Sequence, residues 1–157
     1  MKRFGTLVLM VFLMVSGAFA ADFDPRRPSK EDKCPVCGMF VFKYDDFLAQ
    51  IIFKDGTAAF FDGAKDMFKY YFGLKKYAPS RDLSEVAAVY VTDYYSLTPV
   101  DGTRAYYVIG SKIHGPMGHE LIPFGKEEDA NEFMFDHLGK EVIPFKGITP
   151  EVVKRLD

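Results

Sequence analysis

Short apolar runs alternate with two longer amphipathic segments along most of this chain. Runs rich in β-branched and aromatic residues that are bounded by glycine, proline or aspartate predict β-strands. Apolar residues that recur at three- or four-residue intervals predict helices with one buried face. By these rules we expect strands at residues 40–42, 47–53, 58–61, 86–92, 105–109, 121–124 and 142–145, and helices at about 62–72 and 126–138.

Residues with capping preferences mark the ends of these helices. Asp62 is predicted to be the N-cap of the first helix, and Gly73 to be its C-cap. Gly139 is predicted to end the second helix. Thr149 and Pro150 are predicted to begin a short C-terminal helix.

The order strand, strand, helix, strand occurs twice along the chain. We therefore predict an α+β fold of two fused ββαβ units, the first at residues 34–92 and the second, with the C-terminal helix, at residues 93–157. Residues 21–33 are polar and hold two prolines, so they are predicted to form a flexible N-terminal arm.

The beginning of the chain has the pattern of an export signal. Lys2 and Arg3 precede an uninterrupted apolar run at residues 7–15, and a small-x-small site follows at residues 18–20. This pattern predicts a cleavable Sec-type signal peptide at residues 1–20 and a periplasmic mature protein. The alternative is an uncut membrane anchor, but the apolar run is shorter than the ~20 residues that a spanning helix needs. No cysteine lies near the cleavage site, so neither lipid attachment nor stable membrane insertion after cleavage is expected.

Composition narrows the classes of function. With 157 residues and 48% hydrophobic content, the chain can build one compact core or two small fused ones. Nucleic acid is not an expected partner, because no block of lysine or arginine is interleaved with aromatic residues. No Ser/His/Asp arrangement or phosphate-binding loop is recognisable, so the sequence does not indicate an enzyme. Asp93, directly after the strand at residues 86–92, is open as either a cap or a functional loop acid.

The two cysteines of the chain, Cys34 and Cys37, form a C-x-x-C motif. In an exported protein such a pair can be a structural disulfide. It can also be a redox dithiol, although the strand-then-helix context of a thioredoxin-like site is not predicted here. A structural zinc site would need about four ligands, which two cysteines alone do not supply, although His114, His119 and His137 could contribute. Thiolates are also soft ligands that favour Cu(I) over hard cations.

Two methionines in predicted loops could join the cysteines in a soft metal site. Met39 follows Cys37 by two residues, and Met117 lies between proline and glycine. Thioethers share the preference of thiolates for Cu(I). Possible additional imidazole ligands, His114 and His119, flank Met117. Two other methionines lie on predicted core faces of helices, where packing explains them better: Met67 and Met134.

Six segments in chain order form a specific pattern when they are taken together. They are Cys37-Gly38-Met39, Ala49-Gln50-Ile51, Phe60-Phe61-Asp62, residues 89–93, residues 105–111 and Pro116-Met117-Gly118. They span nearly all of the mature chain, and the chain resembles the NosL family of nitrous-oxide reductase accessory proteins.

The resemblance implies an extracytoplasmic protein that binds Cu(I) and supplies copper for assembling the copper sites of nitrous-oxide reductase. It implies copper ligands at Cys37, Met39 and Met117, and partners among copper-transport and nitrous-oxide reductase maturation proteins. The family fold of two ββαβ units agrees with the repeat. Family members are commonly lipoproteins anchored by an N-terminal cysteine, whereas this chain has an ordinary cleavage site. It also carries Cys34 as an additional thiol. That thiol could be a second ligand, half of a disulfide that switches the site off, or a sign of a different client.

Two hypotheses from different classes follow. The first is a periplasmic Cu(I) metallochaperone without enzymatic activity, in which Cys37 supplies the charged ligand and two thioethers complete a low-coordinate site. The second is an extracytoplasmic thiol-disulfide oxidoreductase that uses Cys34 and Cys37. Met39 and Met117 discriminate between the hypotheses, because a redox dithiol needs neither thioether.

Overall fold

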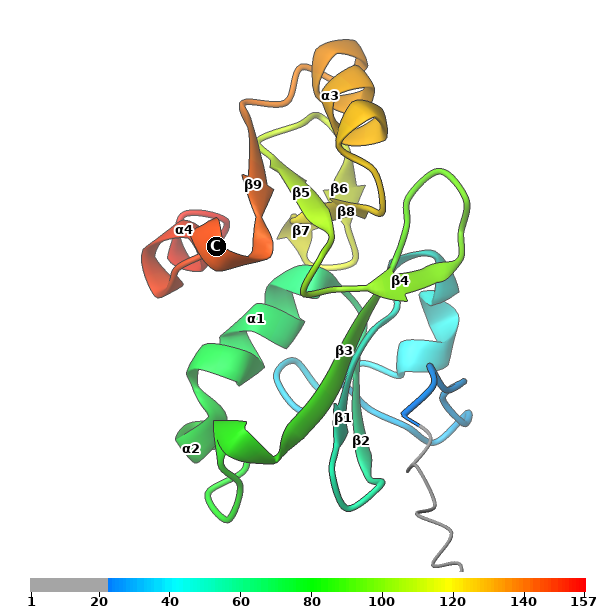
Figure 1. Cartoon of the computed structure of the whole chain (residues 1–157), viewed down its shortest axis with the longest axis vertical. Coiled ribbons are helices and arrows are strands. Elements are labelled where there is room, and N and C mark those ends of the chain that lie inside the picture. Colours follow the sequence, from blue (N-terminus) through cyan, green and yellow to red (C-terminus); the bar gives the residue numbers. More distant parts are fainter. Residues whose placement is uncertain (1–22) are drawn as a thin grey trace, which may run out of the picture.

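The computed structural model describes residues 23–157, which form two main antiparallel sheets with helices packed against them (Figure 1). The expected signal peptide at residues 1–20 and the first two residues of the arm lie outside the described residues. Within residues 23–157, every helix is too short or too polar to span a bilayer.

The first sheet has four strands in the order β2-β1-β3-β4. Every residue of β1 is buried, because this strand is central in the sheet and both of its faces are covered. The β1–β2 hairpin turns at Gly56, whose φ of +81° suits a tight Asp-Gly turn. The strands are β1 (Ala49–Phe53), β2 (Ala58–Phe61), β3 (Val86–Thr92) and β4 (Pro99–Asp101).

Two helices follow β2 and pack on one face of this sheet. Met67 and Phe68 of the first helix are buried in the same cluster as Ile51, as the helical spacing predicted. Gly73 is the C-cap of that helix, also as predicted. The elements are α1 (Ala64–Phe72), α2 (Leu74–Tyr77) and the 3₁₀ turn η3 (Leu83–Glu85) that leads into β3.

The predicted N-cap of α1 is wrong. The N-cap residue is Gly63, in an extended conformation, one position after Asp62. Glu120, from the second half of the chain, accepts the Lys65 backbone N–H at 2.5 Å and so caps the first turn of α1, because Gly63 has no side chain that could do so. Gly63 leaves room for it, because a Cβ at this position would lie 2.3 Å from Glu120 Oε2. The Asp62 side chain therefore does not cap α1 and can contact a residue outside the helix.

The second sheet repeats the topology of the first. Its strands lie in the order β8-β5-β9, which corresponds to the order β2-β1-β3. The helix α3 separates β8 from β9 along the chain, as α1 separates β2 from β3. The predicted α+β fold of two fused ββαβ units is confirmed. The elements are β5 (Tyr106–Ile109), β8 (Ile122–Phe124), α3 (Glu127–Asp136) and β9 (Glu141–Pro144).

The strand predicted at residues 40–42 is wrong. Phe40 makes an isolated β-bridge to Lys33, and the chain then turns into the 3₁₀ turns η1 (Val41–Lys43) and η2 (Asp45–Phe47). Val41 is fully buried in the main core, so this apolar run is explained by an inserted side chain and not by pairing with a sheet. The glycine-rich connection after β5 contains a hairpin of β6 (His114–Gly115) and β7 (Gly118–His119).

The C-terminal segment closes the structure against α1, and Figure 1 shows α4 beside that helix. After the 3₁₀ turn η4 (Phe145–Gly147), α4 (Pro150–Lys154) begins at Thr149, whose side chain accepts the Val152 N–H at 3.3 Å, as predicted. The largest apolar cluster includes Phe68 and Tyr107, so one core joins the two units. A smaller cluster lies between α3 and the second sheet.

Candidate metal centre

Both cysteines lie in a tight loop between the N-terminal arm and η1. The Cys34 N–H donates to the Met39 carbonyl, and the Gly38 N–H donates to the Cys34 carbonyl, each at 2.9 Å. Gly38 has a φ of +79°, in the left-handed region that favours glycine. The loop therefore turns back on itself. It leaves Cys34 buried and Cys37 partly exposed, both as free thiols.

Two aspartates at the start of α1 face these thiols. Cys37 Sγ donates to Asp62 Oδ1 at 3.2 Å, and Cys34 Sγ donates to Asp66 Oδ2 at 3.5 Å. Asp62 and Asp66 are four residues apart, a spacing that puts them on one side of the helix start. One ligand atom from each of the four side chains lies within 4.8 Å of the other three. We call these four residues the thiol–aspartate cluster.

The surroundings of the cluster keep its thiols protonated. Burial, together with the nearby Asp62 carboxylate, raises the pKa of Cys37 to about 11, although the Met39 N–H acts in the opposite direction. Burial also raises the pKa of Cys34, and Asp62 adds to the effect. Asp62 Oδ2 is buried with no hydrogen-bond partner among residues 23–157. A buried acceptor without a partner is costly, and a bound cation would compensate it.

The cluster has the chemistry to bind a metal ion once the thiols lose their protons. Two thiolates are soft donors suited to Cu(I), while the carboxylates are harder donors. Asp62 and Asp66 accept the two S–H groups, so their carboxylates lie directly beside the sulfurs from which metal binding would displace the protons. The cluster therefore fits a soft cation held mainly by sulfur.

The predicted thioether ligands lie on two segments, one in the cysteine loop and one bonded to the helix of this cluster. Met39 is partly buried, and its carbonyl closes the cysteine loop. Met117 lies in the turn between β6 and β7 and is 44% exposed. Its carbonyl accepts a hydrogen bond from Lys65 Nζ at 2.8 Å, which anchors the hairpin to the helix that carries Asp66. The assignment of Met39 and Met117 as metal ligands stays a prediction.

The two histidines near Met117 face each other across the β6–β7 hairpin. His114 and His119 are paired in the register of the two strands, and their ring centroids lie 4.8 Å apart. Both side chains are exposed. Their role as possible additional ligands also stays a prediction.

Comparison with known proteins identifies the family. The sequence profile described as NosL matches residues 25–153, which is most of the chain. The chain belongs to the NosL family. A curated NosL relative, the copper-binding lipoprotein NosL of Stutzerimonas stutzeri, is 30% identical over 164 residues, which cover 94% of this chain and 82% of the relative.

A solved NosL structure has the same fold. The crystal structure of the copper chaperone NosL from Shewanella denitrificans matches with a TM-score of 0.67 at 23% sequence identity. The match covers 82% of this chain and 97% of that chain. At this identity the likeness establishes the shared arrangement of strands and helices.

Sequence reasoning missed the two aspartates of the cluster in this NosL-family chain. Asp62 has a local explanation as an N-cap, and Asp66 is an ordinary acidic residue in the first turn of a helix. Their four-residue spacing at the start of a helix could have indicated that both aspartate side chains point in the same direction. Nothing local, however, indicates that Cys34 and Cys37 lie opposite them, because that contact depends on how the cysteine loop folds back onto α1.

Proposed function

We propose that this NosL-family protein is a periplasmic Cu(I)-binding metallochaperone that delivers copper for assembling the copper sites of nitrous-oxide reductase, and that it is not an enzyme. The observation that carries the proposal is the thiol–aspartate cluster, in which two free thiols and two carboxylates converge within 4.8 Å. The relative named as a copper-binding lipoprotein supports both the metal and a location outside the cytosol.

Copper is the cargo in this proposal, and the two thiols have different parts in its exchange. Cys34 is 1% exposed, so it holds the ion from inside the protein. Cys37 is partly exposed, so the ligands of a donor or acceptor protein can reach it. Ligands that are replaced one at a time let a tightly bound ion leave without passing through water.

Met39 and Met117 are proposed to complete the soft site together with Cys37. The Lys65 ammonium holds the carbonyl of Met117 and leaves its exposed thioether able to turn. Thioethers carry no charge, so they add selectivity for Cu(I) with less affinity than a thiolate. A ligand set of this kind suits a protein that must give its metal away.

A Cu(I) titration in competition with a chromogenic chelator tests these ligands. We expect one Cu(I) per chain and a loss of affinity of about a hundredfold or more in Cys37→Ser, because the charged soft ligand is removed. Met39→Leu and Met117→Leu should each weaken binding by about tenfold. Met134→Leu is the matched control, because Met134 packs against the smaller apolar cluster. Unchanged affinity in both Cys37→Ser and Met117→Leu would exclude the assignment.

The alternative is an extracytoplasmic thiol-disulfide oxidoreductase, which one observation favours. The sulfurs of Cys34 and Cys37 lie within 4.8 Å of each other, close enough for a small shift to join them. The raised thiol pKa values act against this function, because the attacking species in thiol-disulfide exchange is the thiolate. In an insulin-reduction assay without copper, we expect no acceleration. Reduction that persists in a Met39→Leu, Met117→Leu double variant would favour the oxidoreductase.

The client and the location need separate experiments. Copper-loaded protein incubated with apo nitrous-oxide reductase should produce the absorption of the reductase copper sites, and a Cys37→Ser protein should not. Mass spectrometry of protein recovered from periplasm should give a chain that begins at Ala21 and carries no lipid. A chain that retains residues 1–20 would instead indicate an anchor.

A further inference from the structure

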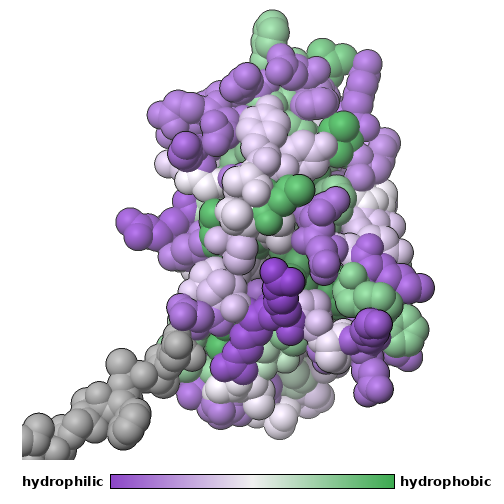
Figure 2. Space-filling view, turned by 90° about the vertical axis from the view of Figure 1, so that its right-hand side faces the viewer, coloured by the Kyte–Doolittle hydropathy of each residue, from purple (hydrophilic) through white to green (hydrophobic). Residues whose placement is uncertain are grey.

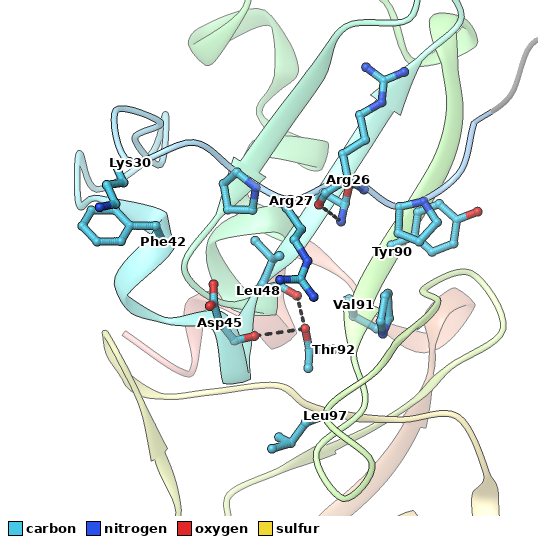
Figure 3. Close-up of a pocket in the computed structure, with 14 residues that line it drawn as sticks. Arg26, Arg27, Lys30, Phe42, Asp45, Leu48, Tyr90, Val91, Thr92 and Leu97 are labelled. Carbon is cyan, nitrogen blue, oxygen red and sulfur yellow. Dashed lines mark hydrogen bonds between the residues drawn. The ribbon is translucent and has the colours of Figure 1, made fainter.

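One cavity of the protein lies away from the thiol–aspartate cluster and shares no residue with it. It has a volume of about 460 Å³ and lies between the N-terminal arm and the first sheet (Figure 3). Ile51 belongs to the core on the α1 side of the sheet, so its neighbour Gln50 points to the opposite face. The cavity lies on that opposite face. We call it the arm pocket.

Hydrogen bonds from Gln50 fix the arm as one wall of the arm pocket. The Arg26 N–H donates to Gln50 Oε1 at 2.8 Å, and the Gln50 side-chain amide donates to the Arg26 carbonyl at 3.1 Å. Gln50 is only 2% exposed, so both bonds are shielded from water. The arm therefore holds the side chains that follow Arg26 at defined positions over the sheet.

The arm brings positive charge to the pocket. Figure 3 shows the Arg27 side chain reaching down over Leu48 and Lys30 lying beside Phe42, while Arg26 points away from the cavity. Arg26 instead donates to the Gly56 carbonyl. Within residues 23–157, no hydrogen bond or ion pair ends on the side chains of Arg27 or Lys30. Among the described residues, two cations without partners therefore line one pocket of a chain whose net charge is −2.

Apolar side chains complete the lining, and one of them is held under strain. Phe42, Leu48 and Leu97 contribute to the wall. Leu97 is 55% exposed and has a φ of +53°, a left-handed conformation that is unfavourable for leucine. The Leu97 N–H donates to the Asp93 carbonyl at 2.9 Å, which enforces this conformation. Core packing does not explain an exposed leucine that is held in this conformation at the wall of a cavity, and backbone strain beside a cavity is consistent with a binding site.

We propose that the arm pocket binds a segment of a partner protein in which a carboxylate side chain lies next to an apolar one. The carboxylate pairs with Arg27, Lys30 adds positive charge at the edge of the pocket, and the apolar side chain packs against Leu48, Phe42 and Leu97. Asp45 is the single carboxylate in the lining, so the charge around the pocket stays positive. A segment with both features matches the pocket in charge and in polarity.

The surrounding surface agrees with recognition of a short segment. Figure 2 shows a mainly hydrophilic face on the side of the molecule that carries the arm, with small apolar areas scattered between polar residues. Such a surface lacks the broad apolar area of an obligate interface. The pocket is therefore suited to a transient partner.

The probe is a short labelled peptide that alternates glutamate and leucine. Two matched peptides, one with lysine in place of glutamate and one with serine in place of leucine, report the two halves of the specificity. Fluorescence anisotropy gives the affinities, and amide chemical shifts of the full mature chain locate the site. We expect the glutamate–leucine peptide to bind at least about tenfold more tightly than either matched peptide. Its largest shifts should lie at Arg27, Lys30, Phe42 and Leu97.

Two kinds of variant test the pocket itself. Arg27→Glu and Lys30→Glu should each weaken the peptide by about tenfold. Lys146→Glu makes the same charge change on η4, outside the pocket, and should leave binding unchanged. Leu97→Asn should weaken the peptide while keeping or raising the melting temperature, because asparagine tolerates a positive φ. If Leu97 had only a structural role, a Leu97→Asn protein with an equal or higher melting temperature would bind the peptide as tightly as wild type.

Several results would overturn the proposal. They are the absence of peptide binding, equal binding of the lysine peptide, shifts confined to another surface, and the same effect in Lys146→Glu as in Arg27→Glu. Binding to vesicles of phosphatidylcholine and phosphatidylglycerol that Arg27→Glu abolishes, without any binding of the peptide, would assign the arm to a lipid surface instead.

Discussion

Asp93 shows at the scale of one residue how a buried carboxylate can connect the β3–β4 loop of the first sheet to the second sheet. Its Oδ2 accepts the Gly125 N–H at 2.7 Å from the loop before α3, and its Oδ1 accepts the Ser96 N–H at 2.8 Å within its own loop. Burial alone would raise the pKa of Asp93, but the hydrogen bonds from Gly125, Ser96 and Tyr95 outweigh burial and lower it. Of the two roles left open by the sequence, Asp93 has that of a cap.

Removing the charge of Asp93 should change the pH dependence of stability. An aspartate with a lowered folded-state pKa stabilises the fold above its unfolded pKa of about 3.9, and this stabilisation is lost as the pH falls through the folded pKa. Asp93→Asn should therefore reduce the free energy of unfolding by about 1–3 kcal/mol at neutral pH and flatten its fall in acid.

Urea unfolding measured from neutral pH into the acid range checks this expectation. Asp46→Asn is the matched control, because Asp46 is exposed and lies in the short turn η2. If Asp93→Asn and Asp46→Asn unfold alike at every pH, the bond from Gly125 to Asp93 does not contribute to stability.

At the scale of elements, α1 takes its cap from the other half of the chain. Glu120 accepts the Lys65 N–H at 2.5 Å and the Leu121 N–H at 2.9 Å, and it is 4% exposed. Gly63 and Gly115 both leave space for its side chain. This arrangement allows Asp62 to leave the capping position and join the thiol–aspartate cluster.

Glu120→Ala should uncap α1 and loosen its first turn. Two buried N–H groups would lose their acceptor, so we expect the free energy of unfolding to fall by about 1–3 kcal/mol. Hydrogen exchange at the Lys65 amide should accelerate more than exchange at the end of the same helix. Glu141→Ala, at an exposed position of β9, should change neither quantity. Equal exchange rates at Lys65 in wild type and Glu120→Ala would show that the helix caps itself.

At the end of α3, one residue does not suit the backbone conformation that it adopts. Gly139 was predicted to stop this helix, but the left-handed residue is Leu138, with a φ of +56°. The Gly139 N–H donates to the Met134 carbonyl at 2.7 Å, the bond of a Schellman motif that normally has glycine one position earlier. Leu138→Gly should therefore raise the free energy of unfolding by about 1 kcal/mol in a urea titration. Leu83→Gly is the matched control and should not raise the free energy of unfolding, because Leu83 is exposed but has no positive φ. A loss of stability in Leu138→Gly would contradict the strain argument.

The elements could be predicted where local pattern and tertiary packing agree. The run at Val86–Thr92 is rich in β-branched residues and is β3, and the spacing around Met67 gave α1. The Phe-Val-Phe run at residues 40–42 failed because an apolar run looks the same whether it pairs in a sheet or inserts one side chain. The cap of α1 failed because its true acceptor, Glu120, lies 55 residues from Lys65 in the sequence. The sequence indicated the two cysteines of the site but not the aspartates opposite them.

At the scale of the whole molecule, a buried lysine joins three distant segments. Lys65 Nζ donates to the Met117 carbonyl at 2.8 Å and to the Leu156 carbonyl at 3.1 Å, and its side chain is 3% exposed. The Asp157 carboxylate lies 3.8 Å away and half-exposed. The hairpin that carries Met117 and the C-terminus are therefore held by the same ammonium on α1.

Lys65→Met should weaken this junction and, through the hairpin, the metal site. The Met117 and Leu156 carbonyls would lose a charged donor in the interior, so the free energy of unfolding should fall by about 2–3 kcal/mol. If Met117 is a ligand, Cu(I) affinity should fall as well, because the hairpin is no longer anchored.

Removal of Leu156 and Asp157 gives the informative comparison, since it loosens the C-terminus but keeps the bond from Lys65 to Met117. That truncated chain should lose stability and keep its Cu(I) affinity, and Lys146→Met, on exposed η4, should lose neither. Equal copper affinities in Lys65→Met and the truncated chain would mean that the anchor of the hairpin does not set the metal site.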